Sequence, residues 1–252
     1  MRSLVFRQVF EASSWTFTYI LGCAVTREAI LIDPVIETVQ RDLKLLNELQ
    51  LTLKYAVNTH CHADHVTGSG EIKRILPAVK SVISASSGAV ADIKLNHLDS
   101  IHFGHHRLEA RSTPGHTDGC FCYVHHIAGM VFTGDTLLIR SCGRTDFQQG
   151  DARRLYNSVH SQLFSLPSYY AVFPAHDYKG FTSSTIEEEC KYNPRLSKSE
   201  DEFVSIMENL NLAYPKQIDK SLPANLVCGI LEDMNDSIRK QVEATYSRGT
   251  QR

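Results

Sequence analysis

Three histidines and an aspartate fall within six residues in the segment Thr59-His60-Cys61-His62-Ala63-Asp64-His65. The apolar run that precedes it, residues 53–58, has the composition of a short buried strand. A strand that ends in a turn can direct several such side chains into one pocket. Imidazole and carboxylate groups bind zinc, iron or manganese in proteins. The sequence therefore predicts a metal site in a loop at the end of a strand.

The segments around this loop alternate between strand and helix patterns. Short runs rich in aromatic or β-branched residues predict strands at 4–10, 16–21, 29–32, 53–58, 81–84, 107–113 and 170–174, with a hairpin at 121–133. Helical patterns cover 38–50 and 151–165, and a further helix is expected to begin at Asp64 and reach Leu76. This order predicts two sheets whose outer faces are covered by helices.

From residue 183 onward the pattern changes to helices, at 183–192 and 199–210, followed by a polar tail at 231–248. In the tail, Leu231, Met234, Ile238 and Val242 fall at helical spacing, which fits either a docked helix or a frayed chain end. We therefore expect a main domain at 1–182 and a C-terminal helical appendage at 183–252 that packs on the same domain.

The composition excludes several classes of protein. The 252 residues suffice for a sizeable core, and a net charge of -2 gives no electrostatic reason to expect nucleic acid or a membrane as partner. No apolar run approaches the roughly 18 residues of a membrane span. The seven cysteines are odd in number and form no Cys-x-x-Cys pair, which favours a reducing compartment.

Three later strands each end in a possible metal ligand: Gly115-His116, Gly134-Asp135 and Ala175-His176. Catalytic loops concentrate at strand ends because a rigid sheet positions them, and glycine lets the backbone turn tightly toward a metal. Each site alone has an ordinary explanation, since a histidine after Pro-Gly is commonly a turn residue. Together with the first loop, they make seven candidate ligands that could bind one metal or two: His60, His62, Asp64, His65, His116, Asp135 and His176.

This set of motifs resembles the metallo-β-lactamase superfamily, which implies an α+β fold: an αββα sandwich with the metal at one edge of the two sheets. The flanking segments 138–148, 174–181, 193–196 and 209–212 resemble persulfide dioxygenases of the ethylmalonic encephalopathy protein type. The resemblance is close to full length. It implies an enzyme of hydrogen sulfide catabolism that oxidises glutathione persulfide with O2 to sulfite and glutathione.

The same resemblance implies one Fe(2+) per chain, bound by His60, His116 and Asp135. Two imidazoles and a carboxylate suit a non-haem iron that must keep positions open. The remaining four candidates, His62, Asp64, His65 and His176, would then orient ligands and substrate through hydrogen bonds. The family also implies a homodimer in the mitochondrial matrix. The cytoplasm is the alternative, because no clear presequence is visible.

Two residues in the family motifs are candidates for positioning the substrate. The guanidinium of Arg144 could anchor a glutathione carboxylate, because it binds carboxylates bidentately, and an internal salt bridge to Asp146 is the alternative. Tyr178 could hydrogen-bond the substrate or could be an ordinary core tyrosine. We expect Cys142 to act as a buried small hydrophobe, and we assign no role to Cys228.

Two other functions remain open. A dinuclear zinc hydroxyacylglutathione hydrolase of the glyoxalase II type could use all seven polar positions, with a bridging hydroxide that attacks a thioester. A non-catalytic protein could keep the same site to store metal or to sense persulfide. Metal content separates the first alternative from the dioxygenase, and turnover of glutathione persulfide would exclude the second.

Overall fold

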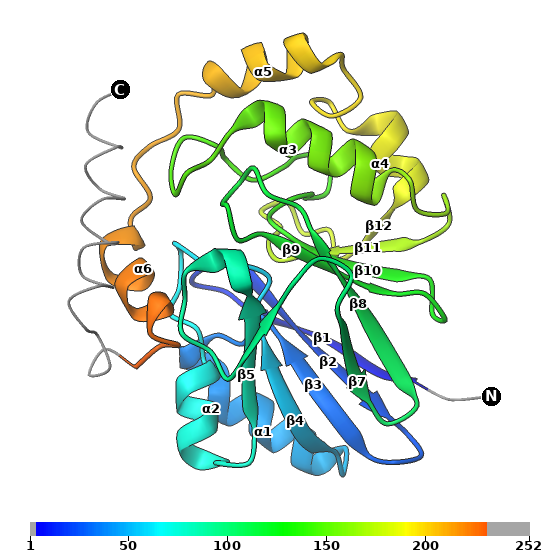
Figure 1. The fold of residues 1–252 in the computed structure, drawn as a ribbon, viewed down its shortest axis with the longest axis vertical. Coiled ribbons are helices and arrows are strands. Elements are labelled where there is room, and N and C mark those ends of the chain that lie inside the picture. Colours follow the sequence, from blue (N-terminus) through cyan, green and yellow to red (C-terminus); the bar gives the residue numbers. More distant parts are fainter. Residues whose placement is uncertain (1–3, 231–252) are drawn as a thin grey trace.

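The structure, a computed structural model, describes residues 4–230. Two six-stranded sheets lie face to face, and helices cover the outer face of each sheet (Figure 1). This arrangement confirms the predicted αββα sandwich. The predicted tail at 231–248 lies outside the described residues.

The first sheet has the strand order β1-β2-β3-β4-β5-β6. Its strands are β1 (Leu4–Glu11), β2 (Thr16–Cys23), β3 (Glu28–Ile32), β4 (Thr52–Val57), β5 (Lys80–Ser84) and β6 (Ile93–Leu95). The first three strands pair antiparallel, whereas the pairs from β3 to β6 are parallel. Parallel neighbours need crossover connections, and the helices α1 (Val39–Glu48) and α2 (Ser69–Ile75) lie in two of them.

The second sheet has the strand order β12-β11-β10-β9-β8-β7. Its strands are β7 (Ser100–Phe103), β8 (His106–Ser112), β9 (Phe121–His125), β10 (Met130–Gly134), β11 (Ala171–Pro174) and β12 (Ser184–Thr185). β10 and β11 are parallel, and the helix α3 (Ala152–Ser158), continued by a π-helical turn at Val159–Leu163, lies in their connection. The other pairs are antiparallel.

The core between the sheets is aromatic. Phe132 and Phe173 stack with ring centroids 5.5 Å apart, and the fully buried ring of Tyr19 lies 4.9 Å from that of Phe132. The outer faces are covered separately. Val39 and Leu46 of α1 pack on the first sheet, while α3, α4 (Ile186–Tyr192) and α5 (Glu200–Glu208) cover the second. Helices therefore cover the outer faces of the two sheets, as predicted.

Two predicted helix starts are wrong. The chain does not enter a helix at Asp64, because the backbone of residues 66–68 bonds to other segments instead: the Val66 carbonyl accepts from Ile36 and the Gly68 amide donates to Pro34. α2 begins only at Ser69. The segment predicted as a helix from residue 183 first forms β12 against β11, and a capping box between Thr185 and Glu188 then starts α4.

A helix that the sequence did not predict, α6 (Ile218–Leu226), packs against the histidine-rich loop through Leu222 and Leu226. It contains Pro223, which argues against a helix in sequence-based reasoning. Within residues 4–230, none of the helices is long and apolar enough to cross a membrane.

Candidate metal centre

Loops that follow β4, β8 and β10 converge at one edge of the sandwich and bring His60, His116 and Asp135 together. One ligand atom of each residue lies within 4.8 Å of the ligand atoms of the other two. The rings of His60 and His116 are nearly perpendicular, with centroids 5.0 Å apart. The structure therefore groups the same three residues that the family resemblance assigns to iron.

The orientation of His60 is fixed by Thr59. The Thr59 hydroxyl lies 2.9 Å from Oδ2 of Asp33, to which it donates, and 3.0 Å from Nδ1 of His60, from which it accepts. This places the ring proton of His60 on Nδ1 and leaves the lone pair on Nε2 for a metal. A carboxylate that orients a ligating imidazole through a second hydrogen bond is a common feature of metal sites.

His116 is oriented in a similar way from the opposite side. Its Nδ1 lies 2.6 Å from the carbonyl oxygen of Arg144, to which it donates, and its Nε2 lies 3.6 Å from Oδ2 of Asp135. A distance of 3.6 Å is too long for a hydrogen bond between these two groups. Nε2 of His116 and the carboxylate therefore both remain available to a cation between them.

Asp135 presents its carboxylate from a tight turn at the end of β10. Gly134 has φ +53, and an added Cβ at this position would lie 2.7 Å from the Thr59 hydroxyl, so glycine is required. Oδ1 of Asp135 is buried and lacks a hydrogen-bond partner within residues 4–230. A buried carboxylate oxygen without a donor is costly. The carboxylate of Asp135 and the imidazoles of His60 and His116 therefore form a set of ligands that fits a metal ion.

A second group of possible ligands lies beside the first. His62, Asp64 and His176 also bring one ligand atom each within 4.8 Å of one another. Asp64 is shared, because its Oδ2 lies 2.9 Å from Nδ1 of His65 and 3.5 Å from Nε2 of His176. The structure thus brings together all seven residues predicted from the sequence, although His65 falls outside both groups of three.

Burial and nearby charges shift the pKa values of His60, His62 and Asp135 in the directions that favour metal binding. Burial lowers the pKa of His60 and of His62 well below the usual range, so both imidazoles are neutral at pH 7. Burial raises the pKa of Asp135, but the nearby His176 and His116 outweigh it, and the net pKa is lowered. Metals bind neutral imidazole and ionised carboxylate, which are the forms these residues adopt.

His176 carries the opposite shift. Burial lowers its pKa, but the carboxylates of Asp64 and Asp135 outweigh this effect, and the net pKa is raised. Both carboxylates lie 3.5 Å from its Nε2. Nε2 of His176 therefore faces both acids, at a distance that leaves Oδ1 of Asp135 without a hydrogen bond within residues 4–230.

The two substrate candidates lie at the margin of the centre. The Arg144 guanidinium forms the alternative salt bridge to Asp146, at 2.6 Å and 2.7 Å, and also donates to the Ala213 carbonyl. Tyr178 is not a core residue: it is 60% exposed, and its ring stacks on that of His176 with centroids 6.1 Å apart. Cys142 is buried and contacts Met207, as expected for a small hydrophobe.

Two residues of the site were missed by the sequence reasoning. Asp33, which follows the strand predicted at 29–32, accepts hydrogen bonds from Thr59 and lies 3.0 Å from Nε2 of His62. Its position directly after β3 is the same strand-end signal that identified the other ligand loops. Trp15 has φ +60, and its carbonyl lies 3.3 Å from Nδ1 of His176. A backbone contact of this kind leaves no signal in the sequence.

Comparison with known proteins identifies relatives along most of the chain. Residues 16–176 match the family described as the metallo-beta-lactamase superfamily. The human protein named persulfide dioxygenase ETHE1, mitochondrial, is 58% identical over 227 residues, which cover 90% of this chain and 89% of that protein. The crystal structure of ETHE1 from Myxococcus xanthus superposes with a TM-score of 0.87 at 47% identity, covering 90% of this chain and all of that one.

A probable hydroxyacylglutathione hydrolase from Schizosaccharomyces pombe is more distant. It is 32% identical over 166 residues, which cover 64% of each chain.

Proposed function

The chain belongs to the metallo-beta-lactamase superfamily and, within it, to the persulfide dioxygenases, and from this we propose that it oxidises glutathione persulfide with dioxygen. The observation that carries the proposal is 58% identity to the human persulfide dioxygenase over 90% of the chain. The chain is therefore an oxidoreductase. The products we propose are sulfite and glutathione, which place the reaction in hydrogen sulfide catabolism.

We propose that the cofactor is one Fe(2+) per chain, held by Nε2 of His60, Nε2 of His116 and the carboxylate of Asp135. The support is the ligand set: two imidazoles, each oriented through its Nδ1, and a carboxylate whose buried Oδ1 has no hydrogen-bond partner within residues 4–230. A facial set of two histidines and one carboxylate leaves open positions on iron. The bound iron would supply a single centre where a persulfide anion and dioxygen can react.

The overall reaction balances as RSS⁻ + O2 + H2O giving RSH + SO3²⁻ + H⁺. The sulfur–sulfur bond breaks, the terminal sulfur loses four electrons to dioxygen, and the remaining glutathione thiolate takes a proton. His176 can hold a proton at Nε2, between Asp64 and Asp135, close to this chemistry. We propose that Tyr178, exposed and stacked on His176, and Arg144, beside His116, position the glutathione part of the substrate.

The runner-up is a dinuclear hydroxyacylglutathione hydrolase. The observation that favours it is the second group, His62, Asp64 and His176, together with the fission yeast relative. In the dioxygenase, we propose that these residues stay metal-free. The support is the higher identity to the persulfide dioxygenase, 58% against 32% for the hydrolase. Hydrogen bonding does not separate the two groups: Asp33 engages Nε2 of His62, but the buried Nδ1 of His62 has no partner within residues 4–230.

Elemental analysis of protein purified without added metal tests this choice. The dioxygenase predicts about one iron per chain, because only the first group binds a metal. Two zinc ions, or two mixed metals, per chain would support the hydrolase instead. Hydrolysis of a lactoylglutathione thioester should be absent in the first case and present in the second.

We further propose that the protein forms a homodimer and acts in the mitochondrial matrix, with the cytoplasm as the alternative. The support for the location is the name of the human relative, which is described as mitochondrial. Light scattering of the purified protein and fractionation of cells that express it test the two proposals separately.

A further inference from the structure

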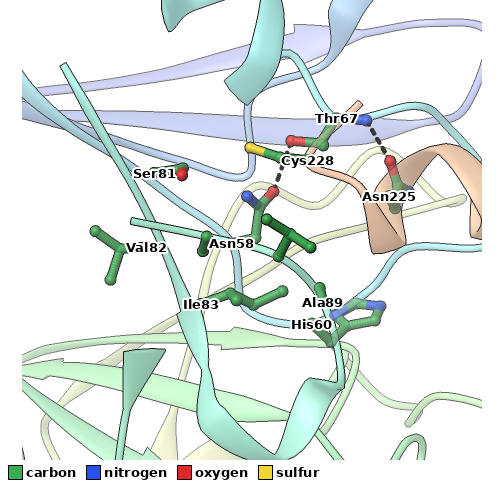
Figure 2. Close-up of a pocket in the computed structure, with 11 residues that line it drawn as sticks. Asn58, His60, Thr67, Ser81, Val82, Ile83, Ala89, Asn225 and Cys228 are labelled. Carbon is green, nitrogen blue, oxygen red and sulfur yellow. Dashed lines mark hydrogen bonds between the residues drawn. The ribbon is translucent and has the colours of Figure 1, made fainter. Parts of the chain in front are cut away.

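Besides its apolar packing, helix α6 is hydrogen-bonded to the histidine-rich loop by the buried side chain of Asn225. Only 4% of Asn225 is exposed. Its Nδ2 donates to the carbonyls of His62 and His65, each at 2.8 Å, and its Oδ1 accepts from the amide of Thr67, also at 2.8 Å. Figure 2 shows the last of these bonds beside the cavity that His60 and Cys228 help to line. All three bonds therefore go to the backbone of the ligand-bearing loop.

The side-chain amide of asparagine matches what this loop needs. A loop that is neither helix nor strand must satisfy its buried backbone groups with side chains. An amide supplies two donors and one acceptor from one compact group, whereas a carboxylate supplies only acceptors and a hydroxyl only one donor. Asn225 thus pairs three buried backbone groups on both sides of the His62 to Thr67 turn.

The end of α6 approaches the same loop closely enough to hold this geometry. Gly229 has φ +83, and an added Cβ there would lie 2.6 Å from the carbonyl oxygen of Thr67. Thr67 is held on its other side by Asn58, whose Oδ1 lies 2.9 Å from its hydroxyl. The loop therefore lies between its own strand end and α6, with little freedom to shift.

A second segment supports the start of the loop. Nε2 of Gln148, which is 6% exposed, donates to the carbonyl of Cys61 at 2.9 Å. The carbonyls of residues 61, 62 and 65 are thus bound by side chains that come from two distant parts of the chain. The backbone between His60 and His65 follows a path set by these contacts.

We propose that Asn225 is a positioning residue of the metal centre, which fixes the loop so that His60 faces His116 and Asp135. Asn225 is 160 residues away from His65 in sequence and does not belong to either group of ligands. Metal sites lose affinity when the supporting contacts of their ligands are removed. Metal loading should therefore depend on the hydrogen bonds of Asn225. This inference rests on the metal centre of the proposed function, not on the reaction.

Two substitutions separate the hydrogen bonds of Asn225 from the packing of α6. Asn225→Ala removes all three bonds, while Asn225→Asp keeps the shape and the acceptor for Thr67 but has no donors for the two carbonyls. Leu222→Ala is the matched control, because Leu222 is buried in the same helix and contacts the apolar cluster. The probe is Co(2+) binding to metal-free protein, titrated against a competing chelator, with thermal unfolding measured in parallel.

We expect both Asn225 variants to bind Co(2+) about 10-fold to 100-fold more weakly than the unmodified protein. The absorption spectrum of the bound Co(2+) should also differ from that in the unmodified protein. Leu222→Ala should lower the unfolding temperature but bind Co(2+) within about twofold, with an unchanged spectrum. Equal losses of affinity in Asn225→Asp and Leu222→Ala would overturn the proposal, because stability alone would then explain them.

Hydrogen exchange on the unmodified protein gives a test that no folding defect can affect. Coupling between two sites is reciprocal. If the hydrogen bonds of Asn225 favour metal binding, metal binding must in turn stabilise these hydrogen bonds. The Thr67 amide, which donates to Asn225, should exchange more slowly after Co(2+) binds. Exchange at an unchanged rate would contradict the proposal. Neither experiment depends on persulfide oxidation, so a failure here and a failure of the proposed function are distinguishable.

Discussion

Nε2 of His62 lies 3.0 Å from Oδ1 of Asp33, and each of the two side chains is 1% exposed. The same carboxylate accepts from the amide and the hydroxyl of Thr59, at 2.7 Å and 2.9 Å, and Thr59 in turn orients His60. Burial raises the pKa of Asp33, and the nearby His60 and the hydrogen bonds from Thr59 offset only part of this rise. One buried carboxylate therefore sets the orientation of a proposed iron ligand and of its neighbour.

Asp33→Asn tests this relationship. The amide keeps the shape of the side chain but places a donor against a donor at Thr59 or His62, so the loop loses at least one bond. We expect metal affinity to fall about 10-fold to 100-fold, as for other residues that orient metal ligands. Metal titration of the variant measures it, with Asp99→Asn, an exposed carboxylate in a turn, as control. Unchanged affinity in Asp33→Asn would contradict the assigned role.

Alanine substitution of the three proposed ligands should remove both metal and activity. His60→Ala, His116→Ala and Asp135→Ala each delete one of three protein donors, so we expect iron content to fall to a small fraction of that in the unmodified protein. Sulfite production and oxygen uptake with glutathione persulfide should fall at least about 100-fold. His102→Ala, which changes an exposed histidine in β7, should have no effect. Full activity in any one ligand variant would remove that residue from the assignment.

Arg144 is expected to act mainly through substrate binding. Arg144→Ala removes a guanidinium that pairs with Asp146 and donates to Ala213, and with it the proposed anchor for a glutathione carboxylate. We expect KM for glutathione persulfide to rise about tenfold, because a charge-assisted hydrogen bond contributes roughly 1.5 kcal/mol. Steady-state kinetics measure this. Arg153→Ala, on an exposed ion pair of α3, is the control. A decrease in kcat with an unchanged KM would contradict this role. It would indicate that Arg144 acts through its backbone carbonyl, which accepts a hydrogen bond from His116.

The pair formed by His106 and His125 predicts how stability depends on pH. Their Nδ1 and Nε2 atoms lie 3.1 Å apart, and both residues are buried. Burial, followed by the neighbouring His106, lowers the pKa of His125 from 6.5 to about 4. In that window the unfolded chain binds a proton that the folded chain does not, so the free energy of unfolding should fall as pH drops from 6.5 toward 4.

Urea unfolding of metal-free protein at several pH values in that window measures the slope. His125→Gln should flatten it, while His102→Gln, which changes an exposed histidine, should leave it unchanged. His60 and His62, also shifted downward by burial, contribute in the same direction, so a residual slope is expected in the variant. Identical slopes for His125→Gln and the unmodified protein would show that this histidine pair does not contribute.

The ligand loops could be predicted because each one follows a strand whose apolar composition is recognisable. His116, Asp135 and His176 each lie within four residues of the end of such a strand, and the sandwich brings these strand ends to one edge. Asp33 follows the same rule, directly after β3, but it was not among the predicted site residues. The number of metals could not be predicted, since the two groups of three are equally complete in sequence.

The remaining errors concern short strands and features that depend on contacts between distant segments of the chain. β6, β7 and β12 have between two and four residues, too few for a periodic pattern, and exist because a neighbouring strand offers hydrogen bonds. The start of α2 is displaced from Asp64 because the backbone of residues 66–68 is bound by distant segments. The role of Asn225 depends on contacts to a loop 160 residues away, which local patterns do not carry.

The most direct test of the central claim is a simultaneous measurement of oxygen uptake and sulfite formation by the iron-loaded protein with glutathione persulfide. The balanced reaction predicts that one O2 is consumed for each sulfite formed, with glutathione released in equal amount, and that activity is lost on chelation and restored by Fe(2+). Persulfide left unoxidised under air, together with hydrolysis of a glutathione thioester by a two-zinc form, would contradict the dioxygenase assignment.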